Sequence, residues 1–390
     1  MRATFAILSL PLLSLAACGG GGGAGTQSLG SIAPPIAGGT VSGGGVVAAT
    51  PTPTPTSTPS SFLDVKAATT FDAVGAMHSI NVDANNASLY EGNASTVSTP
   101  SGTITYDPRD GIFSVAIADA KAGVTRTMGY QDPAHRTDFK PGSTPQLEVP
   151  DLVGFNYLRA ASGTDSTDTF FYERPGNTAT YVSLAGFVHQ STTDATDPTS
   201  PAFHSERGVL VFGTKTALLG IPTSGSGHFD GDFLATMIAS GSIDSGARAN
   251  LPLQWISGTS SVDVDFGKST VALGLTGTVG AAYLGNIKAN DFYTGVAAGS
   301  TFTAAGTATI AGLGGNFTGK FATAGFTSAG TTTAVNFGPI SAASSVAGAS
   351  SIDGAFYGPN AVNIGGNFRI TGGVPDQRLD ILGAFTAAKK

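Results

Sequence analysis

Residues 262–275, with the sequence VDVDFGKSTVALGL, decide the fold class. Apolar residues alternate with other residues on both sides of Gly267: Val262, Val264 and Phe266 before it, and Val271, Leu273 and Leu275 after it. A period of two is that of a β-strand with one face against a core. The stretch therefore predicts two antiparallel strands joined by a tight turn.

The same alternation recurs through residues 208–390. Phe317, Gly319 and Phe321 alternate with polar residues, and so do Val362, Ile364, Gly366, Phe368 and Ile370. Eight or nine such strands are predicted, and eight strands close into a barrel whose interior is just filled by side chains. We expect an all-β protein that ends in an eight-stranded antiparallel β-barrel. A β-sandwich is the alternative, which periodicity does not distinguish from a barrel.

Residues 61–207 also predict strands. Thr103–Tyr106 and Ile112–Ile117 flank a Pro- and Gly-containing turn, which indicates a β-hairpin. Thr169–Glu173 and Thr180–Val188 form a second predicted pair, and residues 131–165 between the two pairs are polar and irregular. This part of the chain is predicted to be a separate β-rich domain.

Charge supports this division. Residues 61–207 carry nine basic and 17 acidic side chains, whereas residues 208–390 carry nine of each. An acidic domain disfavours binding to nucleic acid or to anionic lipid, because both repel carboxylates. It could suit a basic protein partner, although acidity more often serves solubility.

The first eighteen residues have the features of an export signal. Arg2 precedes an apolar run over residues 5–15 that is too short to cross a bilayer. The run ends in Leu15-Ala16-Ala17-Cys18, which resembles the bacterial lipobox, and Cys18 is the only cysteine in the chain. Residues 1–17 are therefore predicted to be a lipoprotein signal peptide and Cys18 the lipidated residue. The single cysteine also excludes intramolecular disulfides and thiolate metal clusters.

A tether is predicted to follow Cys18. Residues 19–60 contain no charged side chain, begin with five consecutive glycines and end in alternating Thr and Pro at 50–55. Such a composition cannot bury enough apolar surface to fold, and its prolines favour extended polyproline II geometry. We expect residues 18–60 to be a disordered spacer between an acylated cysteine and the folded body. Gly19 after the cysteine favours transfer to the outer membrane, by resemblance to other lipoproteins.

Residue patterns of catalysis and metal binding are not evident. The histidines are scattered and lack a metal-ligand spacing, namely His78, His135, His189, His204 and His228. Nucleophile elbows and nucleotide-binding loops are missing as well. Asp263 and Asp265 share a strand face, which a solvated face explains more simply than a catalytic pair. Trp255 is either an exposed binding residue or a core residue, and we favour the core. We predict no enzyme, no catalytic residues, no cofactor and no metal site.

The C-terminal residues resemble a known family. Gly354-Ala355-Phe356-Tyr357-Gly358-Pro359-Asn360-Ala361, Gly365-Gly366-Asn367-Phe368 and Gly383-Ala384-Phe385 look like the closing strands of the transferrin-binding protein B-like surface lipoproteins. Gly208–Thr216, followed by Ile221-Pro222-Thr223, resembles the opening barrel strand of that family's one-lobe members. The resemblance implies a strand-rich handle domain over 61–207 and a β-barrel domain over 208–390. The glycines and the Tyr-Gly-Pro-Asn turn of the motif are expected to be structural.

The same resemblance implies a function. Members of the family are surface-exposed and lipid-anchored on the outer membrane, where they bind transferrin, haemoglobin, haemophores or complement factor H, mainly through loops and the handle. A single lobe disfavours transferrin itself. We expect capture of a protein or an iron- or haem-bearing solute for a TonB-dependent outer-membrane transporter, at ligand-binding residues that the sequence does not identify. The alternatives are an adhesive or structural surface lipoprotein, and a lipocalin-like barrel that holds a small ligand.

Overall fold

The computed structural model describes residues 62–82, 88–119, 124–132, 148–161, 166–174, 180–192, 203–240, 252–284, 287–288, 296–311, 314–338, 349–373 and 378–390. Cys18, the predicted tether and His135 lie outside these ranges. In the described part the chain is built from strands and three short 3₁₀ turns, η1 (Phe62–Asp64), η2 (Leu218–Gly220) and η4 (Pro359–Ala361). The predicted all-β class is confirmed.

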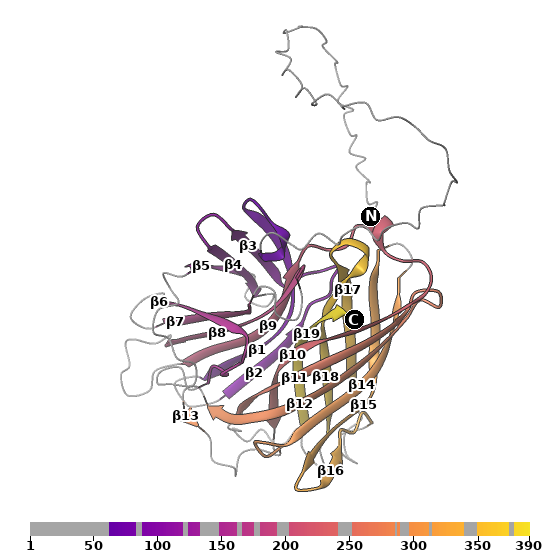
Figure 1. Ribbon diagram of the computed structural model, residues 1–390. Helices are drawn as coiled ribbons and strands as arrows, with labels where there is room; N and C mark the ends of the chain where they lie inside the picture. The colour runs from indigo at the N-terminus through magenta and orange to yellow at the C-terminus, as the bar shows by residue number, and fades with distance from the viewer. Residues whose placement is uncertain are drawn as a thin grey trace, which may run out of the picture. The chain divides into compact units, whose positions relative to one another are not determined.

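The first nine strands form one antiparallel sheet, here called the handle sheet (Figure 1). Its strands lie in the order β5-β4-β3-β1-β9-β8-β7-β6, and β2 also pairs with β1. Their bounds are β1 Thr69–Val82, β2 Ser88–Ala94, β3 Gly102–Asp107, β4 Ile112–Asp119, β5 Val124–Gln131, β6 Phe155–Ala161, β7 Ser166–Glu173, β8 Val182–Thr192 and β9 Phe203–Gly213. Both predicted strand pairs are confirmed as β3–β4 and β7–β8. One strand, β6, lies in the stretch predicted to be irregular.

The second sheet closes on itself. Its ring order is β10-β11-β12-β14-β15-β17-β18-β19, and β19 pairs again with β10. The bounds are β10 Ser226–Ser240, β11 Leu253–Asp265, β12 Thr270–Leu284, β14 Thr301–Ile310, β15 Asn316–Ser328, β17 Ala349–Tyr357, β18 Asn363–Gly373 and β19 Arg378–Lys389, with short strands β13 (Ile287–Lys288) and β16 (Thr331–Ala334) at its margin. Every pairing is antiparallel. The ring confirms the eight-stranded barrel over the β-sandwich.

Phenylalanine side chains fill the barrel interior. Phe233 on β10 contacts Phe302 on β14, three strands away around the ring, with ring centroids 6.1 Å apart. Phe317 on β15 likewise reaches Phe385 on β19 at 6.5 Å. Contacts between strands so far apart require side chains to meet in the middle of the barrel. Protein atoms therefore occupy the space that a lipocalin-like ligand would need, which argues against that alternative.

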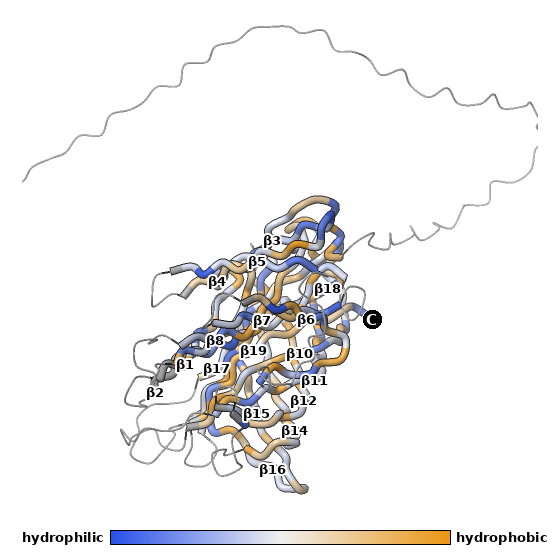
Figure 2. The backbone as a smooth tube through the Cα atoms, turned by 90° about the vertical axis from the view of Figure 1, so that its left-hand side faces the viewer, coloured by the Kyte–Doolittle hydropathy of each residue, from blue (hydrophilic) through white to orange (hydrophobic). Residues whose placement is uncertain are grey.

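Alternation of apolar and polar residues positions this core. Val262, Val264, Val271, Leu273 and Leu275 are all at most 2 % exposed, as their period predicts. Figure 2 shows hydrophobic positions interspersed with hydrophilic ones along the strands. In β14 the alternation is complete, because buried positions alternate with exposed threonines and alanines over Thr301–Thr309.

The outer face of β18 is buried as well as its inner face. Asn363 and Asn367 alternate with the apolar residues of this strand, yet they are only 2 % and 1 % exposed. The handle sheet covers them: Asn367 Nδ2 donates to the carbonyl oxygens of Gly75 and Ser95, at 2.8 and 2.7 Å. Asn363 Oδ1 accepts from the Tyr181 amide at 3.0 Å. Both faces of β18 are therefore buried.

A second apolar core joins the two sheets. It includes Val74, Phe171, Val209 and Val211 from the handle strands, and Leu234, Trp255, Ala355 and Ala384 from the outer face of the barrel. Trp255 is 4 % exposed, and its indole donates to the carbonyl oxygen of Glu148 at 2.7 Å. The core assignment of Trp255 is confirmed, although its core lies between the sheets and not inside the barrel.

The predicted opening strand of the barrel is in the other sheet. Residues 208–213 belong to β9, which pairs with β1 and β8 of the handle sheet. The expected boundary between residues 207 and 208 thus falls within a strand. The prediction of a barrel strand here was wrong because Val209–Phe212 is apolar on both faces, and a strand buried on both sides suits either sheet equally. The first barrel strand is β10.

Residues 214–222 cross one end of the barrel. Thr216 donates its amide to the Phe356 carbonyl oxygen at 2.9 Å, and its hydroxyl to that of Gly358 at 2.6 Å. We call this end, where β10, β12, β15 and β18 begin, the η2 end. Phe62 and Leu63 lie near it, since Thr214 Oγ1 donates to the Leu63 carbonyl oxygen at 3.3 Å. Among the residues with described positions, no helix has the length and apolarity to span a membrane.

Candidate functional site

The outward faces of β10, β11, β12 and β14 form a shallow groove near the η2 end. Its volume is about 610 Å³, and its outward-facing lining residues include Ser226, His228, Asp263, Asp265, Thr270 and Thr307. These side chains are polar because period two places them opposite the buried residues of the same strands. The groove therefore offers carboxylates, hydroxyls and an imidazole to solvent.

His228 is held at the centre of this acidic face. Its Nδ1 lies 2.7 Å from Asp263 Oδ1, and its Nε2 lies 3.0 Å from Asp230 Oδ1. The hydrogen bond with Asp263 is the main reason that the pKa of His228 is raised above its ordinary value. Both ring nitrogens donate when the ring is charged, so the two carboxylates favour the imidazolium.

A neighbouring carboxylate is paired with lysine. Lys268 Nζ lies 2.7 Å from Asp265 Oδ2, and this contact holds the pKa of Asp265 below its usual value. Asp230 and Asp232 continue the acidic row along β10. The face thus carries Asp230, Asp232, Asp263 and Asp265, and we call these four residues together with His228 the acidic face.

A small crevice adjoins the acidic face at the handle sheet. It has a volume of about 190 Å³ and is lined by Leu152, Val153 and Leu184 on one side and by Asp232 and Thr259 on the other. Val153 is 99 % exposed. The crevice therefore places an exposed apolar side chain beside the carboxylate of Asp232.

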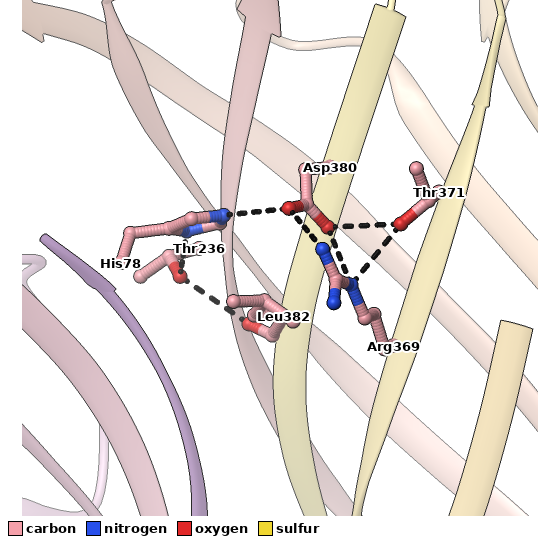
Figure 3. Close-up of polar contacts among 6 residues, drawn as sticks. All are labelled: His78, Thr236, Arg369, Thr371, Asp380 and Leu382. Carbon is pink, nitrogen blue, oxygen red and sulfur yellow. Dashed lines mark hydrogen bonds and ion pairs between the residues drawn. The ribbon is translucent and has the colours of Figure 1, made fainter. Parts of the chain in front are cut away.

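A cluster of buried charged side chains around Asp380 fixes the handle sheet against the barrel. Asp380, only 1 % exposed, accepts from Arg369 Nη2 at 2.8 Å and from Thr371 Oγ1 at 3.1 Å (Figure 3). His78 on β1 lies with Nε2 3.8 Å from Asp380 and Nδ1 2.9 Å from Thr236 Oγ1. Burial alone would raise the pKa of Asp380, but His78 and Arg369 outweigh it and hold the pKa well below the ordinary range. The cluster joins β1 to β10, β18 and β19.

A glycine makes this cluster possible. A Cβ atom on Gly92, in β2, would lie 2.5 Å from Asp380 Oδ2 and 3.3 Å from the His78 ring. Any side chain at position 92 would displace the carboxylate. Gly92 therefore seals the cluster from one side, which leaves no room there for a ligand.

A buried ion pair lies next to it. Arg207, opposite His78 in the β1–β9 register, pairs with Glu148, and both side chains are 1 % exposed. Burial lowers the pKa of Arg207 to about 9, which leaves it charged at neutral pH. Gln190 also donates to Glu148. This pair closes the same inter-sheet core as Trp255.

The handle sheet has its own charged cluster. His189 Nδ1 lies 2.7 Å from Asp168 Oδ1, which is also 3.3 Å from Arg126 Nη1. His204 Nε2 lies 3.2 Å from Glu206 Oε1, and Arg126 pairs with the same glutamate. Burial opposes ionisation of Glu206, but His204 and Arg126 lower its pKa. Both carboxylates, Asp168 and Glu206, therefore lie beside a basic side chain, so the cluster has a structural role in the handle sheet.

The sequence and structure agree only in part on these residues. Four histidines each lie beside a carboxylate, although none has a metal-ligand spacing in sequence, because every partner except Asp230 and Glu206 comes from a different strand. In the described ranges, no three His, Cys, Asp or Glu side chains are placed to hold a metal ion. Asp263 and Asp265 do lie on a solvated face, as predicted, but the sequence did not single out this face as a binding site.

Comparison with known proteins identifies the barrel. Residues 221–389 match the sequence model described as the C-lobe and N-lobe beta barrels of Tf-binding protein B. No curated protein matches the chain in sequence. The matched residues begin just before β10 and end with β19, so they comprise the whole closed sheet.

Solved structures show distant similarity. A single mutant of transferrin-binding protein B from Haemophilus parasuis Hp5 is 13 % identical, with a TM-score of 0.33 and coverage of 83 % of this chain and 76 % of that chain. HpuA from Kingella denitrificans, in complex with human haemoglobin, is 10 % identical with a TM-score of 0.26 and coverage of 72 % and 83 %. Transferrin-binding protein B from serogroup B Neisseria meningitidis is 11 % identical with a TM-score of 0.24 and coverage of 83 % and 77 %.

The assignment rests on the sequence match and on the closed eight-stranded ring that the same residues form. Residues 221–389 form a closed eight-stranded β-barrel and match the sequence model of the transferrin-binding protein B barrels.

Proposed function

We propose that this chain is a non-enzymatic binding lipoprotein, anchored to the outer membrane through Cys18 and exposed at the cell surface. It captures a protein, or an iron- or haem-bearing solute, for an outer-membrane transporter. The observation that carries the proposal is the match of residues 221–389 to the barrels of a transferrin-binding protein. Leu15-Ala16-Ala17-Cys18 supports the anchor, because the sole cysteine stands where a lipobox would place it.

We assign ligand contact to the acidic face and the adjoining Val153 crevice. A rim of carboxylates accelerates association with a partner that presents lysines or arginines, and this effect weakens as salt screens the charges. Val153 adds apolar surface that a partner can bury. The partner expected on this face is therefore a protein with a basic surface, a narrower class than the family resemblance alone implies.

Binding titrations test this assignment. The full chain is immobilised, and transferrin, haemoglobin and haem are passed over it at low and high salt. Binding of at least one of them, weakened by salt and by Asp230→Asn/Asp263→Asn, is the expected result. Asp110→Asn is the matched control, since Asp110 is an exposed aspartate in the β3–β4 turn, away from the acidic face. Unchanged binding in the double variant would remove the acidic face from the proposal.

Membrane fractionation tests the anchor separately. Cys18→Ala should abolish acylation and release the protein from the membrane fraction. A Cys18→Ala protein that stays in the membrane fraction would show that acylation is not the anchor. An adhesive surface lipoprotein would keep the anchor but bind none of the three ligands, and its loss would not slow growth when iron is scarce.

A further inference from the structure

We propose that the η2 end of the barrel rests on the lipid surface, with Leu218 and Leu219 inserted into the membrane interface. The inference deepens the proposed function, since it rests on the Cys18 anchor that holds the protein at a membrane.

Two adjacent leucines at this end face water. Leu218 is 53 % exposed and Leu219 is fully exposed, whereas the described chain has only two other exposed large apolar residues, Ile112 and Val153, which stand singly. Both leucines lie in the 3₁₀ turn η2, so the turn presents them together. Transfer of two leucine side chains out of water is favourable in any environment that accepts them.

Contacts on both sides of η2 hold the turn in place, so the exposed positions of Leu218 and Leu219 are fixed by the fold. The hydrogen bonds of Thr216 to Phe356 and Gly358 fix the chain before the turn. After it, Ile221 packs against Gly315, where a Cβ would lie 2.0 Å from Ile221 Cδ1. Gly315 has a φ of +63°, a conformation that also favours glycine. A well-ordered turn that exposes two adjacent apolar side chains indicates an interaction surface.

A groove of mixed polarity lies directly beside the leucines. Its volume is about 340 Å³, and its lining combines the apolar residues Leu218, Ile221, Pro222, Phe266 and Ile310 with Thr223 and Ser269. The groove lies at the mouth of the barrel, at the turns that link β11 to β12 and β14 to β15. The apolar area at this end thus extends beyond the two leucines.

Lysines flank the same area. η2 contacts η4, and Val362 after η4 accepts a hydrogen bond from the Lys389 amide at 2.9 Å. Lys389 and Lys390 are exposed, and in the described part of the chain neither makes an ion pair. Lys390 also donates its amide to the His228 carbonyl oxygen at 3.0 Å, so the two lysines lie between the leucines and the acidic face. Apolar side chains that insert, beside cations that meet phosphate, are the features of an interfacial membrane contact.

The point at which residues 1–61 join the described body favours lipid as the partner of this surface. The 61 residues before Phe62 contain the predicted acylation site, and they join the described body at its η2 end. The η2 end is therefore nearer along the chain to the predicted acylation site than the opposite end of the barrel, where β16 lies.

Fluorescence quenching tests the contact. Because Cys18 is the only cysteine and its thiol is acylated, Thr223→Cys gives a unique site for an environment-sensitive fluorophore beside the leucines, and Thr331→Cys gives one at the opposite end. The acylated full chain is bound to phosphatidylethanolamine and phosphatidylglycerol vesicles that contain nitroxide-labelled lipid. The proposal expects a blue shift and quenching at position 223 but neither at position 331.

Variants make the result specific. Leu218→Ser/Leu219→Ser should abolish the quenching at position 223 without changing thermal stability, because both side chains are exposed. Lys389→Gln/Lys390→Gln should make the quenching at position 223 depend less on the phosphatidylglycerol content of the vesicles. Equal spectra at positions 223 and 331 would overturn the proposal, and so would a blue-shifted but unquenched fluorophore, which would mean that protein covers the groove. If the chain failed to float with the vesicles at all, the anchor itself would be refuted, whereas floating without quenching refutes only this contact.

Discussion

The side-chain amide of Asn367, on barrel strand β18, donates a hydrogen bond of 2.8 Å to the backbone carbonyl oxygen of Gly75, which lies 292 residues earlier in the chain. The contact ties the family motif of the barrel to the first strand of the handle sheet. It explains why an asparagine stands on a strand face that would otherwise be solvated. The motif residue supports the inter-sheet core and does not face solvent.

Replacement of Asn367 should therefore destabilise the whole body. Asn367→Ala removes the donor to the carbonyl oxygens of Gly75 and Ser95 and the buried amide that links the two sheets, which should cost about 1–3 kcal/mol in the free energy of unfolding. Asn93→Ala is the matched control, because Asn93 is exposed on β2, and surface substitutions change stability by about 0.5 kcal/mol or less. Denaturant titration measures both, and equal midpoints would contradict the structural role of Asn367.

Truncation of Arg207 should be more costly. Arg207→Met leaves Glu148 as an uncompensated buried charge, for which a loss of about 3–5 kcal/mol is expected. Arg207→Met/Glu148→Gln removes both charges and should recover much of that loss. Arg109→Met serves as a control, since the Arg109–Asp110 pair is exposed and solvent screens such a pair, so its loss should change the unfolding midpoint little. Additive effects of the two changes would show that Arg207 and Glu148 are not coupled.

The Asp380 cluster predicts a pH dependence. The folded state lowers the pKa of Asp380, so the carboxylate contributes stability at pH values above the unfolded aspartate pKa of about 4, and this contribution fades as the pH falls below that value. Asp380→Asn should consequently destabilise the protein at neutral pH and by less at acidic pH. Thermal unfolding of both proteins over a pH series measures the difference, and a difference independent of pH would refute the charged cluster.

His228 should titrate above the ordinary histidine pKa of about 6.5, because Asp263 and Asp230 favour its charged form. Asp263→Asn removes the largest contribution and should bring the pKa back toward the ordinary value. NMR titration of the ring protons reports it directly. Asp110→Asn should leave the His228 titration unchanged, and a similar shift in both variants would exclude a specific contact.

Sequence patterns correctly predicted those features of the fold that depend on a single strand and its adjoining turn. The alternation at Val262–Phe266 and Val271–Leu275 predicted buried and solvated faces correctly, because the core covers only one side of those strands. The same reasoning failed at Asn363 and Asn367, whose outer face meets the handle sheet. Burial of both faces depends on which strands a second sheet covers, and period two carries no information about that.

The polar clusters were missed for a related reason. His78 and Asp380 are separated by most of the chain, and their contact depends on the packing of β1 against β19. Sequence spacing detects ligands or ion pairs on one element, whereas these partners come from several strands. The exposed Leu218-Leu219 pair was readable as an apolar dipeptide, but only the structure shows that the turn holds it outward. Asp263 and Asp265 were correctly predicted to be solvated, but their grouping with Asp230, Asp232 and His228 depends on the pairing of β10 with β11.

Ligand capture by intact cells tests the central claim most directly. Cells that express the chain are incubated with fluorescent transferrin, haemoglobin or a haem analogue, and bound ligand is counted by flow cytometry, with an antibody to the chain as the measure of surface display. We predict capture of at least one ligand by cells that display the parent chain, and loss of capture with Cys18→Ala. Display of the parent chain at the surface without capture of any of the three ligands would contradict the account.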